Sequence, residues 1–173
     1  PARMFHSKTD FTRALADLSA ADAPSQDAAR ARQAELTKPP GSLGRLEEIA
    51  LHLAGWGAGS EIAPNISADK VKVVIFAGNH GVVAQGVSPY PADVTAQMVA
   101  NFSAGGAAIN ALTEAFDLAL DVVPLDLNKP TADMTEKPAM TEVETLVALN
   151  AGAVAVEDDL DVLCLGEMGI GNT

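Results

Sequence analysis

Cysteine, aromatic side chains and positive charge are all scarce in this chain of 173 residues. Its single cysteine, Cys164, excludes an intramolecular disulfide and a cysteine-based zinc site, and the apolar run Val162–Leu165 around it predicts a core residue. Because aromatic residues make up only 4% of the sequence, the core must be built from Ala, Val, Leu and Ile. The formal net charge of −12 argues against binding to nucleic acid or to anionic membrane surfaces.

Long apolar runs are also missing. No run approaches the roughly 18 residues of a membrane span, and Pro1–His6 contains no apolar core of a signal peptide. The three histidines have no metal-binding spacing. We therefore expect a cytoplasmic protein without a metal or a cofactor. A hydrophobic fraction of 48% and a charged fraction of 20% are typical of a globular protein, with one domain or one domain and a small appendage.

The first third of the chain, residues 9–56, predicts helices. Thr9 or Asp10 is placed to cap the first helix, and Pro24 opens a second one. The string Lys38–Gly44 (KPPGSLG) breaks the pattern, since proline does not fit a helix interior, and a third helix follows it. The apolar residues at helical spacing in the first and third helices are Phe11, Leu15, Leu18, Leu43, Leu46, Ile49, Ala50 and Leu53.

The remaining sequence predicts a Rossmann-like parallel α/β sheet flanked by helices. The predicted strands are 71–77, 118–127 and 160–165. The predicted helices between them are 92–102, 106–116 and one that begins with a capping box at Thr141–Glu144 and has Val143, Leu146, Val147 and Val154 on one face. This alternation implies parallel strands joined by right-handed crossovers. We assign residues 1–66 to an N-terminal helical segment of a smaller domain and residues 67–173 to the α/β domain, with a linker at 57–69.

Two strand exits are candidates for chemistry, because open parallel sheets bind ligands beyond the carboxyl ends of their strands. They are 78–88 and 166–173, both rich in Gly or Asn. In the first, His80 is a candidate general base, because histidine as a residue type can exchange a proton near neutral pH, although a histidine in this place also serves in structural hydrogen bonds. Lys38, in KPPGSLG, fits either a phosphate contact or a solvated lysine.

The segment 166–173 (GEMGIGNT) combines glycines with residue types that begin helices. Free backbone N–H groups in such a segment suit a phosphate, and a plain glycine turn is the alternative. A carboxylate beside an anion is repelled. Glu167 therefore fits a ribose hydroxyl, a positioned water or a cationic ring, and its structural alternative is to cap nearby N–H groups.

Three strings together resemble one enzyme family. They are KPPGSLGRL at 38–46, FAGNHGVVAQGVSPYPADVTAQ at 76–97 and GEMGIGNT at 166–173, and GGAAIN at 105–110 agrees with them. Their order and separation resemble the nicotinate-nucleotide–dimethylbenzimidazole phosphoribosyltransferases of cobalamin lower-ligand synthesis. Members of that family are twice as long, so the chain resembles an N-terminal half with an incomplete fold. Strands 71–77 and 160–165 are then expected to expose apolar surface.

The resemblance implies a pentosyltransferase that moves phosphoribosyl from nicotinate mononucleotide to 5,6-dimethylbenzimidazole or a related base, giving α-ribazole 5′-phosphate and nicotinate. The leaving pyridinium is already cationic, so one carboxylate base near the azole suffices. In the family this carboxylate lies in the C-terminal half. The resemblance places at the phosphoribosyl group Gly166, Glu167 (in a supporting catalytic role), Gly169, Gly171, Asn172 and Thr173. It places against the base His80, Ser88, Tyr90, Gln97, Met98 and Met168.

The identity of the base stays open, because some relatives have a serine and a glutamine where this chain has Tyr90 and Met98. Ser88 and Gln97 are nearby and are candidates to replace them, so a benzimidazole, a substituted benzimidazole, adenine and a phenol all remain. The resemblance also implies a homodimer. Two further interpretations remain: a non-catalytic half that needs a partner with the remaining strands, and a nucleotide-binding module without transfer.

Overall fold

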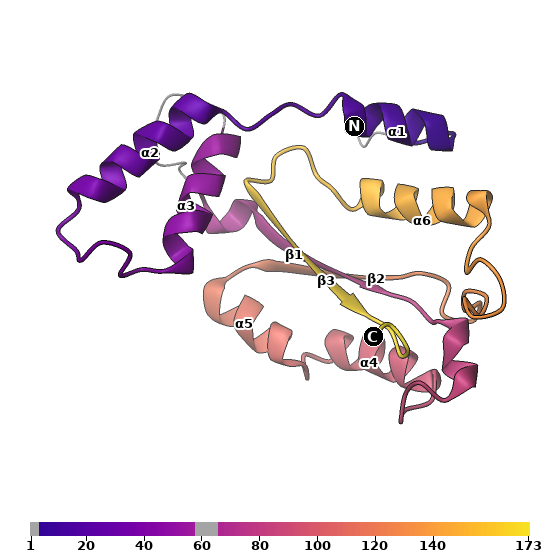
Figure 1. The fold of residues 1–173 in the computed structure, drawn as a ribbon. Coiled ribbons are helices and arrows are strands. Elements are labelled where there is room, and N and C mark those ends of the chain that lie inside the picture. The colour runs from indigo at the N-terminus through magenta and orange to yellow at the C-terminus, as the bar shows by residue number, and fades with distance from the viewer. Residues whose placement is uncertain (1–3, 58–65) are drawn as a thin grey trace. The chain divides into compact units, whose positions relative to one another are not determined.

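The computed structural model describes residues 4–57 and 66–173 (Figure 1). The described residues form two compact units, one containing residues 14–57 and 66 and the other containing residues 4–13 and 67–173. Most of the predicted linker at 57–69 lies outside the described residues, and the domain division at residue 66 stays a prediction. The described elements are α1 (Lys8–Ala16), α2 (Ala23–Glu35), α3 (Arg45–Trp56), the 3-10 turns η1 (Ala68–Lys70) and η2 (Gly81–Gln85), β1 (Val71–Ala77), α4 (Asp93–Ser103), α5 (Ala108–Phe116), β2 (Ala119–Pro124), α6 (Glu142–Val154) and β3 (Val162–Met168).

The larger unit is built on a parallel sheet with the strand order β2-β1-β3. Strand β1 pairs with β2 from Lys72↔Ala119 onward and with β3 from Val71↔Val162 onward. The chain leaves β1 toward one neighbour through α4 and α5, and then reaches the other neighbour through α6. Crossovers of one hand that run in opposite directions place their helices on opposite faces. Figure 1 shows this arrangement, with α4 and α5 on one face of the sheet and α6 on the other. The predicted α/β class is therefore confirmed.

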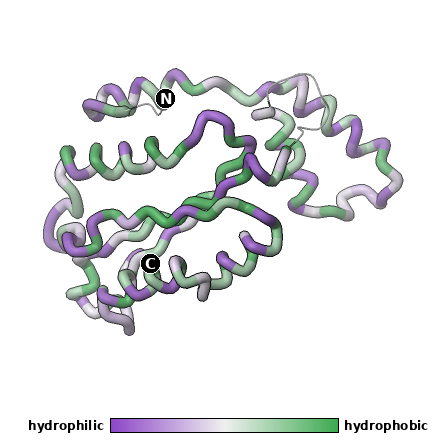
Figure 2. Tube along the Cα trace, turned by 180° about the vertical axis from the view of Figure 1, so that it is seen from behind, coloured by the Kyte–Doolittle hydropathy of each residue, from purple (hydrophilic) through white to green (hydrophobic). Residues whose placement is uncertain are grey.

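The core of this unit is centred on β1, whose predicted bounds are also confirmed. Val74 and Ala77 are fully buried and Val73 and Ile75 nearly so. Figure 2 shows the strands as the most hydrophobic part of the trace. The expectation that 71–77 exposes apolar surface is wrong, because β1 is the central strand and has a partner on each side.

Strand β3 differs from its prediction in burial and in length. Within the described residues β3 pairs only with β1 and so forms an edge of the sheet. Cys164 is exposed and Leu165 keeps 70% of its surface, so the prediction of a core cysteine is wrong. The strand continues to Met168, beyond the predicted end at 165. Strand β2, by contrast, is shorter than the predicted 118–127 and ends at Pro124.

Helix α6 confirms its predicted start. The Thr141 side chain accepts from the N–H of Glu144, and the Glu144 carboxylate accepts from the N–H and hydroxyl of Thr141. The predicted apolar face is exposed, however: Val143 is 70% exposed, and Val147 and Val154 are similarly open. This face of α6 has no cover among the described residues, so its spacing marks an apolar stripe but not a buried one.

A buried lysine ties α6 to the sheet. Lys72, on β1, is 8% exposed and contacts Asp121 of β2 at 2.5 Å and also Glu157, which follows α6. Hydrogen bonds to Asp121 and Glu157 raise the pKa of Lys72 above its usual 10.5, against the opposing effect of burial. A buried ammonium needs such partners, since an unpaired charge in the interior is strongly unfavourable.

Residues 4–13 belong to the same unit. The Phe5 N–H donates to Asn150 Oδ1 at 2.7 Å, and Asn150 Nδ2 donates back to the Phe5 carbonyl at 2.8 Å. The cap of α1 is Ser7, whose hydroxyl accepts from the N–H of Asp10 at 3.0 Å, so the prediction of Thr9 or Asp10 as the cap is wrong. Ser7 is one residue before the helix and can accept from its first turn.

The smaller unit consists mainly of α2 packed against α3. A Cβ on Gly55 would lie 2.7 Å from Gln26 Nε2, so the two helices approach closely there, and a larger residue would displace the Gln26 side chain. In the preceding KPPGSLG turn, Lys38 Nζ contacts Glu47 Oε1 at 2.6 Å and is largely buried, so it is paired within the chain and not simply solvated. The predicted apolar face of α3 is partly exposed: Leu46 is 63% and Ile49 46% exposed.

Candidate functional site

The site predicted from the strand exits lies where the connections of the sheet reverse direction. In the order β2-β1-β3, the chain moves from β1 to β2 on one side and returns to β3 on the other. Ligands of open α/β sheets bind at such a reversal, outside the carboxyl ends of the two adjacent strands. Here Ala77 and Met168 are register partners at those ends. The segments that follow them are 78–81 and 169–173.

The structure brings these two segments into direct contact. The Gly78 N–H donates to the Met168 carbonyl at 3.0 Å and continues the pairing beyond the strands. A Cβ on Gly169 would lie 2.8 Å from His80 Nε2 and would also collide with the Gly78 carbonyl. Gly171 has φ +88°, and a Cβ there would lie 2.6 Å from Val83 Cγ2. Both glycines are therefore required by close packing, and Gly171 also by its backbone conformation.

The glycine-rich segment forms a tight turn. The Asn172 N–H donates to the Gly169 carbonyl at 3.1 Å, and the positive φ at Gly171, the third residue, is the pattern of a type II turn. The Ile170 N–H donates to Thr95 Oγ1 of α4 at 3.1 Å. Among the described residues, the N–H groups of Gly171 and Thr173 have no acceptor. Backbone N–H groups of this kind can bind an anion.

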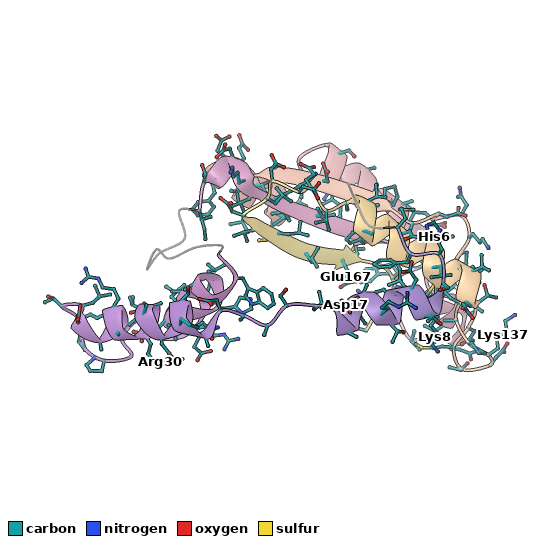
Figure 3. The ribbon with its side chains drawn as sticks, turned by 90° about the horizontal axis from the view of Figure 1, so that it is seen from above. His6, Lys8, Asp17, Arg30, Lys137 and Glu167 are labelled. Atoms are coloured by element: carbon teal, nitrogen blue, oxygen red, sulfur yellow. The ribbon has the colours of Figure 1, made fainter. Side chains whose placement is uncertain are left out.

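Glu167 lies before the turn and not inside it, because Gly166, Glu167 and Met168 are the last residues of β3. This corrects the prediction that the loop begins at 166. Figure 3 labels Glu167 on the strand that forms the free edge of the sheet. Its exposed carboxylate accepts a hydrogen bond from Asn172 Nδ2. The carboxylate and the glycine turn are thus joined through one side-chain amide.

The 78–81 segment is braced by a loop that the sequence did not single out. Asn79 Nδ2 donates to the Leu127 carbonyl at 2.8 Å, and the Thr131 N–H donates to the Asn79 carbonyl at 3.1 Å. The Gly81 N–H donates to Thr131 Oγ1 at 3.3 Å. Within the described chain, Asn79 Oδ1 is buried without a hydrogen-bond partner. Only the strand order brings this loop beside β1, so no local signal could have revealed it.

The residues predicted to contact a base are less closely gathered. Ser88 and Tyr90 lie between η2 and α4, where the Tyr90 N–H donates to Ser88 Oγ at 3.2 Å and Tyr90 is 61% exposed. Gln97 and Met98 lie on α4, exposed and half-buried respectively. No hydrogen bond in the described residues joins these four to Glu167 or to the glycine turn.

The described residues also contain no group of three His, Cys, Asp or Glu side chains that is placed to hold a metal ion. Likewise, no described helix has the length and apolar character needed to cross a membrane.

Sequence comparison defines the class of protein. A family model described as "Phosphoribosyltransferase" matches residues 18–173. The chain belongs to this phosphoribosyltransferase family.

Individual relatives are more specific. The chain is 55% identical over 169 residues to the nicotinate-nucleotide–dimethylbenzimidazole phosphoribosyltransferase of Mesorhizobium japonicum and 57% identical over 169 residues to that of Novosphingobium aromaticivorans. Each match covers 98% of this chain and 49% of the relative. The crystal structure of the Thermus thermophilus enzyme of the same name aligns with a TM-score of 0.73 at 40% identity, over 87% of this chain and 50% of that one. The chain therefore spans about half the length of the relatives that it matches.

Proposed function

We propose that this chain supplies the phosphoribosyl side of an enzyme that transfers phosphoribosyl from nicotinate mononucleotide to 5,6-dimethylbenzimidazole or a related base. The observation that carries the proposal is the glycine turn 169–172, packed on 78–83 where the sheet connections reverse. The names of the relatives at 55% and 57% identity support the substrates.

In this proposal the glycine turn binds the phosphoribosyl group. Backbone N–H donors suit a phosphate in a chain of net charge −12, because they bring no side chain that acidic neighbours would neutralise. Glu167 supports the ribose end, where it orients a hydroxyl together with Asn172. The phosphoribosyl contacts are Gly166, Glu167, Gly169, Gly171, Asn172 and Thr173.

The base lies on the other side of the ribose. We assign its wall to His80, Ser88, Tyr90, Gln97, Met98 and Met168. An azole nitrogen attacks C1′ of the ribose, and the C1′–pyridinium bond breaks. Its electron pair returns to the pyridine nitrogen, so nicotinate leaves neutral at that nitrogen. The proton of the other azole nitrogen passes to a carboxylate. That carboxylate is expected in the part of the relatives beyond their match to residue 173.

Holding the two rings on opposite faces of the ribose supplies much of the rate. Because attack comes from the face opposite the leaving group, the anomeric centre inverts from β to α. The same resemblance supports a cytoplasmic homodimer, with residues 1–66 in a smaller domain.

A fusion tests this function. Residues 1–173 would be joined to the remaining half of the Mesorhizobium japonicum relative, and nicotinate release would be measured with nicotinate mononucleotide and dimethylbenzimidazole. We expect turnover by the fusion, none by the 173-residue chain alone, and none without the base. An inactive but folded fusion, beside an active complete relative, would contradict the proposal.

One observation favours a specific variant of this function. The apolar edge of β3, with Leu165 70% exposed, suits pairing with a further strand. We therefore expect that the two halves, made separately and mixed, regain part of the activity of the fusion. If the mixture restored nothing while the fusion worked, the halves would require a covalent connection.

A further inference from the structure

We propose that Thr95 is a positioning residue whose buried hydroxyl holds the glycine turn 169–172 in the conformation that binds the phosphoribosyl group. The inference rests on the function proposed above. Thr95 is not among the site residues predicted from the sequence. It follows from one hydrogen bond, from Ile170 N–H to Thr95 Oγ1, and from where that bond acts on the turn.

Thr95 is one of the two largest side chains that are fully buried among the described residues; the other is Val74, at the centre of the sheet. It lies in the first turn of α4, where its own N–H donates to the Ala92 carbonyl at 3.0 Å. A buried hydroxyl is unfavourable unless it is hydrogen-bonded. The Thr95 hydroxyl oxygen accepts from the half-buried backbone N–H of Ile170, so both atoms have a partner in this bond.

The bond acts on one peptide plane. The Ile170 N–H and the Gly169 carbonyl belong to the same peptide group, and the carbonyl accepts from the Asn172 N–H at 3.1 Å. The plane is therefore held at both ends, by Thr95 on one side and by Asn172 on the other. With this plane fixed, the next N–H, that of Gly171, has a defined direction. Gly171 N–H is one of the two unpaired donors that we assign to the phosphoribosyl group.

Thr95 also connects the two sides of the proposed site. Gln97 and Met98, which we assign to the wall of the base pocket, follow it on α4. A single buried hydroxyl thus joins the helix of the base wall to the turn of the phosphoribosyl site. Loss of the hydroxyl is expected to loosen the turn and to weaken nucleotide binding more than the chemical step.

The matched control is Thr113, a second buried threonine. It is 5% exposed on α5, and its hydroxyl donates to the carbonyls of Ile109 and Asn110 at 3.0 and 3.1 Å, within its own helix. Thr95→Val and Thr113→Val remove the same hydroxyl from the same kind of buried helical position. Only the first touches the glycine turn. Thr95→Ser keeps the hydroxyl and should rescue the function.

The first measurement is amide hydrogen exchange in the 173-residue chain, which needs no activity. We expect the Ile170 N–H of the unmodified chain to exchange at least tenfold more slowly than that of Gly171. Thr95→Val should abolish this difference, while Thr95→Ser and Thr113→Val preserve it. Equal exchange at Ile170 and Gly171 in the unmodified chain would overturn the proposal, whatever the variants do.

The second measurement is steady-state kinetics in the fusion. Thr95→Val is expected to raise KM for nicotinate mononucleotide about tenfold with KM for the base within twofold, and Thr95→Ser to restore it. Thr113→Val should lower thermal stability and leave both KM values within twofold. If both valine variants raised KM for nicotinate mononucleotide equally, the role of Thr95 would be structural, and Thr95 would have no specific part in positioning the turn. An inactive unmodified fusion would instead contradict the proposed function, and the exchange data would still decide the role of Thr95 in the turn.

Discussion

At the scale of single residues, the site depends on where a side chain is absent as much as on where one is present. Gly169 and Gly171 lie so close to 78–83 that neither position has room for a Cβ. The hydroxyl of Thr95 accepts from the turn at Ile170, and the side-chain amide of Asn172, within the turn, donates to Glu167 on β3. Small changes at these four residues are therefore expected to have large effects.

Gly171→Ala is expected to destabilise the protein more than Gly105→Ala. Both glycines have positive φ, +88° and +77°, which costs an alanine about 1–2 kcal/mol. Only at Gly171 does the new Cβ also meet a neighbour, Val83 Cγ2 at 2.6 Å, and overpacking adds about 1–3 kcal/mol. Urea unfolding of both variants checks this. Equal decreases in the free energy of unfolding for the two variants would mean that the Val83 side chain moves aside at no cost.

Glu167→Gln in the fusion is expected to slow turnover at least tenfold, because an amide is neutral and orients a ribose hydroxyl less strongly. Glu142→Gln, an exposed change at the start of α6, serves as the control and should leave the rate unchanged. The measurement is kcat for nicotinate release. A rate that stays at that of the unmodified fusion would assign Glu167 only its hydrogen bond with Asn172.

At the scale of elements, the sequence was most informative where a short local pattern is compatible with only one kind of structure. The β-branched run 71–77 became β1 with its predicted bounds, and Thr141–Glu144 became a capping box. The sequence was least informative about which helix faces are buried. The apolar spacings of α3 and α6 were right, but Leu46 and Val143 are exposed. Burial depends on what packs against a face, and periodicity alone does not contain that information.

The candidate site divides in the same way. Segments 78–81 and 169–173 were predicted because glycine and polar residues follow strands, which is a local signal. Thr95 and Thr131 were missed, since their partners Ile170 and Gly81 are distant in the chain. The local sequence around a threonine in a helix or a loop does not show that a distant residue will bond to its hydroxyl. Strand order decides these contacts, and it is fixed by the whole sheet.

The start of α6 is expected to weaken in acid. Hydrogen bonds from Lys129 and Thr141 lower the pKa of Glu144 from 4.5 to about 2. A lowered pKa means that the ionised carboxylate stabilises the folded state fully above pH 4.5 and that this contribution is lost as pH falls toward 2. Carbon-13 chemical shifts of the Glu144 carboxyl group would report its titration. A titration midpoint of Glu144 near 4.5 would show that its hydrogen bonds do not stabilise the ionised carboxylate.

At the scale of the whole molecule, the main feature is a parallel sheet with an apolar free edge. Among the described residues β3 pairs on one side only, with Leu165 70% exposed and Cys164 exposed beside it. Unpaired N–H and carbonyl groups on an edge strand can pair with another chain. The relatives, of which this chain covers 49%, have as much sequence again that could supply such a strand.

The 173-residue chain alone is therefore expected to self-associate, and Leu165→Lys should reduce this, because a charge on an edge strand opposes pairing. Phe116→Lys is the matched control, since Phe116 is 66% exposed but lies on a helix. Sedimentation velocity over a concentration series would measure the association. If both lysine variants dissolved the assemblies equally, general solubility and not the strand edge would be responsible.

The central position of β1 has a further consequence for how the protein is made. Val71 pairs with Val162, so β1 cannot complete its pairing until residue 162 has left the ribosome. Such distant pairing makes folding slow. Until β3 has been synthesised, β1 has at most one partner strand, and segments 78–81 and 169–173 cannot yet meet. We therefore expect this protein to depend on chaperones during its synthesis.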